Sequence, residues 1–288
     1  MELMRTRNLL PEVIWRDTSP STNAELRDLV GESPGRPHGT LLVTSDQTAG
    51  RGRLDRGWVT PPDTSLAASL LVREFATEGL EPSWLPLLVG SAFVTALQPH
   101  FTAAAARDGG EAKRVGVKWP NDVHVRDEDD AIAGRPGKKL CGILCELLPG
   151  VPGERGHTVI VGTGINLLIE EWDLPTERAG SLLACGADVG GAESLADAAG
   201  QDLADRVLAD YTAELLRLVD LAATDPGAAR ARVARHSLTL GTEVRVHLPG
   251  GQIVDGRARR LADDGSLVID LPTGGELTVS AGDVEHLR

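Results

Sequence analysis

Residues 139–147 (KLCGILCEL) and 158–167 (TVIVGTGINL) are two apolar runs of strand length, separated by a charged segment with several glycines and prolines. Their aliphatic and β-branched residues favour buried strands. Two such strands joined by a short polar loop are typical of antiparallel pairing, because a parallel pair needs a long crossover. The sequence therefore predicts a sheet that is antiparallel at its centre and not built from repeated strand–helix–strand units.

Apolar residues at strand and helix spacing continue on both sides of this pair. A capping box formed by Thr22 and Glu25 predicts the start of one helix. Ser83 is predicted to cap a second, buried helix that Pro99 ends, because proline has no N–H for a helical hydrogen bond. Residues 47–63 and 127–138 are predicted to be loops. The predicted strands span 12–18, 40–46, 64–72, 115–119 and 122–126, and the predicted helices span 22–31, 83–98, 194–224 and 226–236.

The pattern changes at Ser237, where long helices are followed by short β runs separated by glycine-rich turns. The chain is therefore predicted to divide into a larger unit, residues 1–236, and a separate small β-barrel, residues 237–288. The barrel segment contains no Phe, Trp or Tyr, so an aromatic groove for proline-rich peptides is not expected. The predicted barrel strands span 243–248, 253–261, 267–271 and 276–279.

Composition excludes several classes of function. The 288 residues carry 42 acidic and 29 basic side chains, a net charge of −13, which is not typical of a nucleic-acid-binding protein. Three cysteines make no even disulfide framework and the N-terminus has no apolar signal segment, so a cytoplasmic location is predicted. Residues 85–106 are uncharged, but Pro86, Gln98, Pro99 and His100 favour a buried helix over a membrane span.

The lysines are few and clustered. Of the 29 basic residues only four are lysines, and all four lie within one short window, at Lys113, Lys118, Lys138 and Lys139. A general bias against lysine accounts for the scarcity. The clustering points to a chemical role, because an ammonium group is a compact charge that arginine does not reproduce.

Two segments carry residue types suited to binding an anion. In residues 46–58 (DQTAGRGRLDRGW), glycines alternate with Arg51 and Arg53, so backbone N–H groups and guanidinium groups can converge on one anion. In residues 118–122 (KWPND), a strand delivers Lys118 to a turn, where it can hold a carboxylate or a phosphate. A solvated Arg/Gly loop and a plain turn with a surface lysine are the alternatives that these residues leave open.

Two further segments can approach a ligand closely. Residues 162–166 (GTGIN) combine small residues with the amide of Asn166, and residues 21–23 (STN) lie at a predicted helix N-terminus, where donors can cap the helix or bind a polar ring. The first of these segments lacks the third glycine of a dinucleotide-binding turn. Cys141 and Cys145 have no partners at zinc-ligand spacing. No tightly bound metal or redox cofactor is predicted.

Five segments resemble the motifs of biotin protein ligases, which attach biotin to carboxylase carrier domains. In the order in which the family has them, these segments are residues 21–23 (STN), 50–53 (GRGR), 118–122 (KWPND), 139–144 (KLCGIL) and 162–166 (GTGIN). The resemblance implies an α+β fold: a mixed-sheet catalytic domain like that of class II aminoacyl-tRNA synthetases, followed by a small SH3-like β-barrel. It also implies an ATP-dependent ligase that forms biotinyl-5′-AMP and then transfers biotin to a lysine of a biotin carboxyl carrier protein domain.

The resemblance also implies roles for individual residues. Lys118, Arg51 and Arg53 would be catalytic. One departure from the family pattern lies between Arg53 and Trp58, where Asp55 replaces a glycine and adds a negative charge to the loop. The implied biotin-binding residues are Ser21, Thr22, Asn23, Gln47, Gly50, Arg51, Gly52, Arg53, Lys118 and Gly142. The implied ATP-binding residues are Arg53, Arg56, Trp58, Lys118, Asn121, Lys139 and Asn166.

Mg²⁺ is expected to arrive with ATP, and the chain is expected to be a monomer or a weak dimer. Only about 20 residues precede Ser21, too few for the winged helix-turn-helix of bifunctional relatives, so no DNA partner is expected. A lipoate or octanoate ligase of the same fold is the nearest alternative. A non-catalytic biotin sensor is an alternative of another class.

Overall fold

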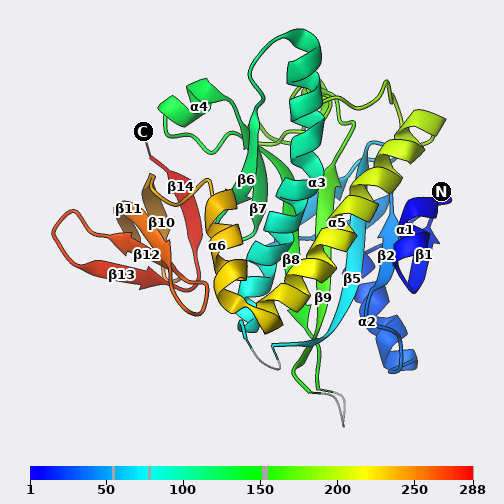
Figure 1. The fold of residues 1–288 in the computed structure, drawn as a ribbon, viewed down its shortest axis with the longest axis horizontal. Coiled ribbons are helices and arrows are strands. Elements are labelled where there is room, and N and C mark those ends of the chain that lie inside the picture. Colours follow the sequence, from blue (N-terminus) through cyan, green and yellow to red (C-terminus); the bar gives the residue numbers. More distant parts are fainter. Residues whose placement is uncertain (54–55, 77–78, 151–154, 288) are drawn as a thin grey trace.

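The computed structural model describes the chain except residues 54–55, 77–78, 151–154 and 288. Its centre is a seven-stranded sheet in which β1 and β2 are parallel and every other neighbouring pair is antiparallel (Figure 1). The predicted antiparallel pairing at the centre of the chain is confirmed, as is the mixed sheet. In spatial order the strands are β1 (Glu12–Arg16), β2 (Thr40–Thr44), β5 (Ser65–Phe75), β9 (His157–Asn166), β8 (Lys138–Leu147), β7 (Asp122–Arg126) and β6 (Arg114–Lys118).

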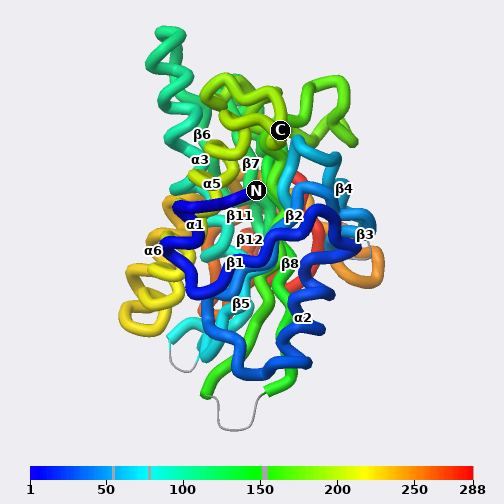
Figure 2. The backbone as a smooth tube through the Cα atoms, turned by 90° about the vertical axis from the view of Figure 1, so that its right-hand side faces the viewer, coloured from blue at the N-terminus to red at the C-terminus, as the bar shows by residue number. Residues whose placement is uncertain are grey.

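Helices cover both faces of this sheet (Figure 2). Because side chains alternate across a strand, Leu41 and Val43 of β2 join the main core, whereas Leu42 faces the opposite side and packs near Leu26 of α2 (Thr22–Glu32). The main core includes the long helices, where the rings of Phe93 and Tyr211 stack. The helices are α1 (Met4–Leu9), α2 (Thr22–Glu32), α3 (Leu85–Asp108), α4 (Glu128–Ile132), α5 (Ala198–Thr224) and α6 (Pro226–His236), with short 3-10 turns η2 (Pro82–Trp84) and η3 (Glu171–Asp173).

Helix α3 differs from its prediction at both ends. It continues for nine residues beyond Pro99, because burial of residues such as Phe101 and the alanine-rich sequence around it outweigh the one lost hydrogen bond. Ser83 does not cap the helix but donates its hydroxyl to the carbonyl oxygen of Asp264. Among the described residues, only the helix Pro82–Asp108 is long and apolar enough to cross a membrane by length and composition, and 72% of its apolar window is buried.

The start of α2 also differs from its prediction. Ser21, not Thr22, is the N-cap residue, and its hydroxyl accepts the N–H of Ala24 at 3.5 Å. Glu25 does not close a capping box, because its carboxylate contacts Arg16 Nε at 2.5 Å. The predicted box is therefore wrong, although a helix does begin at this point.

Both predicted loops contain regular structure. Residues 47–63 include the hairpin strands β3 (Gln47–Arg51) and β4 (Gly57–Thr60), and residues 127–138 include α4. Leu54 and Asp55 lie outside the described part of the chain, so the expected effect of Asp55 stays a prediction.

The C-terminal segment forms a second, antiparallel sheet in the order β13-β12-β11-β10-β14. Because β13 and β14 are its two edges and do not pair with each other, the described strands make an open sheet and not the closed barrel that was predicted. The last strand, β14, was not predicted. The strands are β10 (Glu243–His247), β11 (Ile253–Leu261), β12 (Leu267–Asp270), β13 (Glu276–Val279) and β14 (Asp283–His286).

The C-terminal segment is attached to the end of β6. Leu238 N donates to Val117 O at 2.8 Å, Trp119 N donates to Thr239 Oγ1 at 3.0 Å, and the indole N–H of Trp119 donates to Gly265 O at 3.1 Å. These contacts connect the residues on either side of Lys118 to the C-terminal segment. The division into two domains at residue 237 stays a prediction.

We predict that Gly116→Ala destabilises the protein by about 1–3 kcal/mol, because overpacking a close contact costs that much. A Cβ at Gly116 would lie 2.5 Å from Leu238 Cγ and 2.7 Å from the carbonyl oxygen of His236. Urea unfolding measures the change. Gly110→Ala is the matched control, because a Cβ there meets nothing within 4 Å; equal stability of the two variants would contradict the prediction.

Candidate active site

A cavity of about 140 Å³ lies between the β3–β4 hairpin, the N-terminus of α2 and the strands β8 and β9. A second, wider cavity of about 630 Å³ adjoins it, and the two share Arg56, Gly57, Trp58, Asp122, Lys139 and Asp283. Polar side chains line the α2 end of the first cavity, and both cavities contain positively charged side chains. The arrangement suits an elongated ligand that has a polar ring at one end and negative charge at the other.

The floor of the first cavity is made of glycines. In the β8–β9 ladder Gly142 lies directly opposite Gly164. The indole of Trp58 lies on this pair: a Cβ at Gly164 would be 2.0 Å from Trp58 Cε2, and one at Gly142 would be 2.8 Å from Cζ3. Lys139 Nζ lies 5.4 Å from the centre of the Trp58 ring, within the range of a cation–π contact. Only glycine leaves room for a flat ring so close to the strand backbones.

The α2 end of the cavity is held by hydrogen bonds within the protein. Gln47 Oε1 accepts the N–H of Thr22 at 2.9 Å, which satisfies one of the free donors at the helix N-terminus. Asn23 Nδ2 donates to Glu146 Oε1 at 2.8 Å, and Asn23 Oδ1 accepts the hydroxyl of Ser69 at 2.6 Å. These contacts fix the orientation of the side-chain amides before any ligand binds.

The hairpin carries its arginines to the other side of the cavity. Arg53 Nη1 donates to Asn121 Oδ1 at 3.0 Å, and Asn121 Nδ2 donates to Ile143 O at 2.7 Å. Asn121 therefore connects the hairpin to β8. Arg51 and Gly52 line the same cavity.

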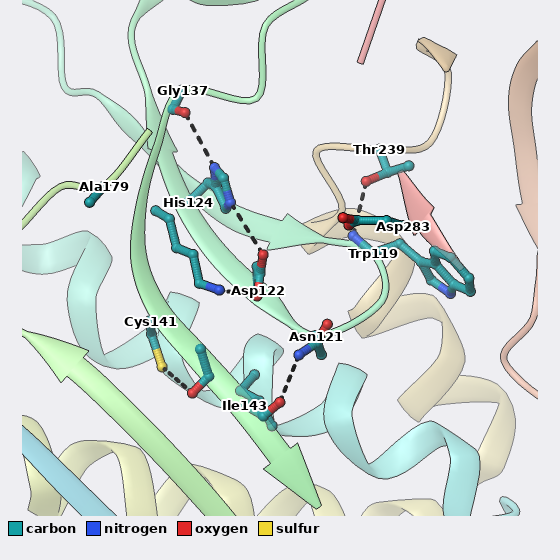
Figure 3. A network of polar contacts seen from close by, with 12 residues as sticks. Trp119, Asn121, Asp122, His124, Gly137, Cys141, Ile143, Ala179, Thr239 and Asp283 are labelled. Atoms are coloured by element: carbon teal, nitrogen blue, oxygen red, sulfur yellow. Dashed lines mark hydrogen bonds and ion pairs between the residues drawn. The ribbon is translucent and has the colours of Figure 1, made fainter. Parts of the chain in front are cut away.

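Asp122 is the centre of the charged network between the two cavities (Figure 3). Its Oδ1 lies 2.7 Å from Lys139 Nζ, and its Oδ2 lies 3.8 Å from His124 Nε2, which is too long for a hydrogen bond. Burial alone would raise the pKa of the Asp122 carboxyl, but His124, Lys139 and Lys118 hold the pKa well below its ordinary value. Asp122 is therefore ionised at neutral pH.

Lys118 lines the second cavity from the end of β6 and is 9% exposed. Burial lowers the pKa of its ammonium group, while the carboxylates of Asp122 and Asp283 oppose that shift. A bound anion would add to those two carboxylates and favour the charged form of Lys118.

The structure brings together almost all the residues implied to bind biotin or ATP, whereas Lys113, which the sequence also singled out, lines neither cavity. Those lining the first cavity are Ser21, Thr22, Asn23, Gln47, Arg51, Gly52, Arg53, Arg56, Trp58, Asn121, Lys139 and Gly142, and Lys118 and Asn166 line the second. Gly50 is the exception: it lines neither cavity and instead packs against the hairpin, where a Cβ would lie 2.4 Å from Trp58 O. Asn166 is 4% exposed and donates its amide to Gly180 O at 2.8 Å.

Sequence reasoning missed several residues of the site. His124 lies two positions after Asp122 in β7, and the period of a strand places both on one face, so its place beside Asp122 was predictable. Asp283 had no such signal, because it lies in a strand that was not predicted and reaches the site only through the packing of the C-terminal sheet.

Within the described residues, no group of three or more His, Cys, Asp or Glu side chains is arranged to hold a metal ion. Asp122 lies at the boundary of the two cavities, and its Oδ1 is paired with Lys139. Asp122 can supply one carboxylate oxygen to a Mg²⁺ ion whose other ligands come from outside the protein.

The sequence pattern of the Biotin/lipoate A/B protein ligase family matches residues 15–166, and that of the biotin protein ligase C-terminal domain matches residues 239–287. The chain belongs to the biotin/lipoate protein ligase family. This ligase is 35% identical over 269 residues to the biotin–acetyl-CoA-carboxylase ligase of Mycobacterium tuberculosis, an alignment that covers 93% of this chain and 86% of the relative. It is also 33% identical over 148 residues to the bifunctional ligase/repressor BirA of Escherichia coli, covering 51% of this chain and 38% of BirA.

Solved structures agree on the fold. The biotin protein ligase of Aquifex aeolicus in complex with biotin and ATP superposes with a TM-score of 0.66 at 24% identity, over 96% of this chain and 100% of that structure. The predicted α+β fold with a C-terminal domain of the ligase type is thereby confirmed, apart from closure of the barrel.

We predict that the protein loses stability as the pH falls from about 6.5, the ordinary pKa of histidine, towards 3. Burial, together with the charges of Lys118, His124 and Arg126, lowers the pKa of His286 to about 3. The unfolded chain therefore protonates this histidine at a higher pH than the folded protein does. The contribution of His286 to the free energy of unfolding is therefore complete above pH 6.5 and is lost as the pH falls.

Urea unfolding at pH 7 and pH 4.5 measures the free energy of unfolding. His286→Asn, which keeps a polar group near Thr239 Oγ1 but does not titrate, is expected to show a smaller difference between the two pH values. An unchanged difference would assign the acid sensitivity to other groups.

Proposed function

We propose that this ligase activates biotin with ATP to form biotinyl-5′-AMP and then transfers biotin to a lysine of a biotin carboxyl carrier protein domain. The observation that carries the proposal is the pair of adjoining cavities, which gathers Arg51, Arg53, Lys139 and Lys118 between a polar ring-sized end and a wider nucleotide-sized space. The relative from Mycobacterium tuberculosis is named for biotinylation of acetyl-CoA carboxylase, which supports the same assignment here.

In the first step, an oxygen of the biotin carboxylate attacks the α-phosphorus of ATP and pyrophosphate leaves. Two anions must meet, so the site needs fixed positive charge at their junction. A pair of unit charges about 4 Å apart interacts by about 4 kcal/mol at an effective dielectric constant of ~20. Lys118 and the hairpin arginines would supply this charge, and the preformed hydrogen bonds of Gln47 and Asn23 would orient the biotin ring.

Mg²⁺ would arrive with ATP. Asp122 is the carboxylate placed to support it, at the boundary of the two cavities. The ion would neutralise part of the triphosphate charge and assist departure of pyrophosphate.

In the second step, a neutral lysine amine of the carrier attacks the acyl carbon of the adenylate, and AMP leaves. The mixed anhydride must be kept from water until then, which the β3–β4 hairpin would do by covering it. Because the pKa of Asp122 is lowered, this carboxylate is a weak proton acceptor, and we assign it the attraction of the carrier's ammonium group and not its deprotonation. Mass spectrometry of a carrier domain incubated with this protein, biotin and MgATP tests the whole proposal.

The C-terminal domain match favours biotin over lipoate, since the larger family includes both kinds of ligase. Thermal shift with biotin or lipoate in the presence of ATP separates the two. A non-catalytic sensor would bind biotin without labelling any carrier. We propose a cytoplasmic monomer or weak dimer, with no DNA partner.

We predict that Lys118→Ala abolishes biotin-dependent pyrophosphate exchange while the protein stays folded, because the buried ammonium group at the reaction centre is lost. Exchange of labelled pyrophosphate into ATP measures the first step, and circular dichroism checks the fold. Lys113→Ala is the matched control, since Lys113 lines neither cavity and donates to Cys185 O at 3.0 Å. Exchange at the wild-type rate in the Lys118 variant would remove this residue from the mechanism.

We predict that Arg53→Ala releases the adenylate early, because the variant loses the contact of the hairpin with Asn121. Proteins mixed with the variant, biotin and MgATP should then be biotinylated on many lysines, which streptavidin blotting detects. Arg217→Ala is the control, because Arg217 is 53% exposed, pairs with Glu214 and lines neither cavity. Labelling that stays restricted to the carrier would contradict a role of Arg53 in retention.

A further inference from the structure

Asp283 connects the C-terminal sheet to the hairpin that covers the first cavity. It is the first residue of β14, and it lines both cavities. Its Oδ2 lies 2.5 Å from Arg56 Nη2, although the two residues are 227 positions apart in the sequence. The carboxylate of Asp283 is thus the partner of the Arg56 guanidinium, a group that we propose binds the nucleotide.

The backbone before Asp283 is built for this placement. Gly282 has a φ of 152°, and a Cβ there would lie 2.7 Å from the carbonyl oxygen of His247. Asp283 itself is paired with His247 in the β10–β14 ladder. Glycine at position 282 therefore lets β14 begin in close contact with β10, with residue 283 at the wall of the cavity. Figure 3 shows Asp283 on the same side of the network as Trp119.

The pair is not needed to assemble the molecule. The C-terminal segment is held by buried hydrogen bonds of Trp119 and by the contact of Leu238 with Val117. The Arg56 and Asp283 side chains are 63% and 40% exposed, and pairs with such exposure contribute little to stability. We therefore expect the Arg56–Asp283 pair to affect the binding of a ligand more than the stability of the fold.

The Asp283 carboxylate opposes the binding of a triphosphate in this cavity, because it repels the phosphates and competes with them for Arg56. Burial would raise the pKa of the Asp283 carboxyl, but the hydrogen bond and charge of Arg56, with Lys118, hold the pKa below its ordinary value. Asp283 is therefore charged at neutral pH. The contact with Arg56 is a single one, whereas a phosphate can accept two hydrogen bonds from one guanidinium.

We propose that Asp283 is a positioning residue: in the absence of nucleotide its carboxylate is the partner of the Arg56 guanidinium, and the phosphates of ATP displace this carboxylate on binding. The inference rests on the proposed binding of ATP in these cavities. Arg56 exchanges its carboxylate partner for phosphate when ATP enters, and returns to Asp283 when the phosphates leave. The contact between Arg56 and the C-terminal sheet must therefore break when the nucleotide binds, which weakens nucleotide binding.

The test measures binding of α,β-methylene-ATP with Mg²⁺ to the biotin-saturated protein by isothermal titration calorimetry, since this analogue is not cleaved. Asp283→Asn is expected to lower the Kd about two- to fivefold, in keeping with the modest strength of an exposed pair. Asp283→Glu, which keeps the carboxylate, should restore the wild-type value. Asp255→Asn is the matched control, because Asp255 pairs with Arg245 on the same sheet with side chains 42% and 43% exposed, and should leave the Kd unchanged.

A second background separates competition from simple repulsion. In Arg56→Gln, the further change Asp283→Asn is expected to have no effect, because there is no guanidinium left to release. An equal gain in both backgrounds, or a single variant that binds no more tightly than wild type, would overturn the proposal. Wild-type protein that does not bind the analogue at all would instead overturn the proposed use of ATP, and with it this inference.

Discussion

The pairing of β8 with β9 places Gly142 opposite Gly164, and this one contact determines what the cavity can hold. Two strand backbones without side chains leave a flat surface on which the ring of Trp58 lies. A methyl group at either position would collide with that ring and push the β3–β4 hairpin away from the sheet. The hairpin carries Arg51 and Arg53, so the positions of these cations depend on a floor that has no side chains.

The second constraint is electrostatic. The chain as a whole is acidic, with a net charge of −13, yet its cavities concentrate cations. The structure balances these cations locally: Asp122 pairs with Lys139, and Asp283 pairs with Arg56. Unpaired charges in a partly buried cavity would be costly, and paired ones can be exchanged for the charges of a ligand. The site is thus stable without a ligand and remains open to an anion.

The third feature is that the site is assembled from segments far apart in the sequence. The turn after Lys118 is held by Thr239 and Gly265 of the C-terminal segment, through the backbone and indole N–H groups of Trp119. The C-terminal sheet also contributes Asp283 to the cavity wall. Residues of both sheets therefore line the candidate active site, and the C-terminal segment helps to hold it in shape.

Local pattern was enough to predict the seven strands of the large sheet and the presence of the long helices, because alternation depends on neighbouring residues. Most residues of the candidate site were implied by the resemblance to biotin protein ligases, which adds information that local pattern alone does not carry. Local pattern failed where distant contacts decide. Pro99 stays inside α3 because the helix is buried on the core, and the Arg/Gly segment forms a hairpin because it packs on the glycine floor. The sequence by itself determined which side chains carry charge and which strands are apolar. Only the tertiary structure decided that Asp283 meets Arg56, because this contact follows from how the two sheets pack and not from the spacing of residues along the chain.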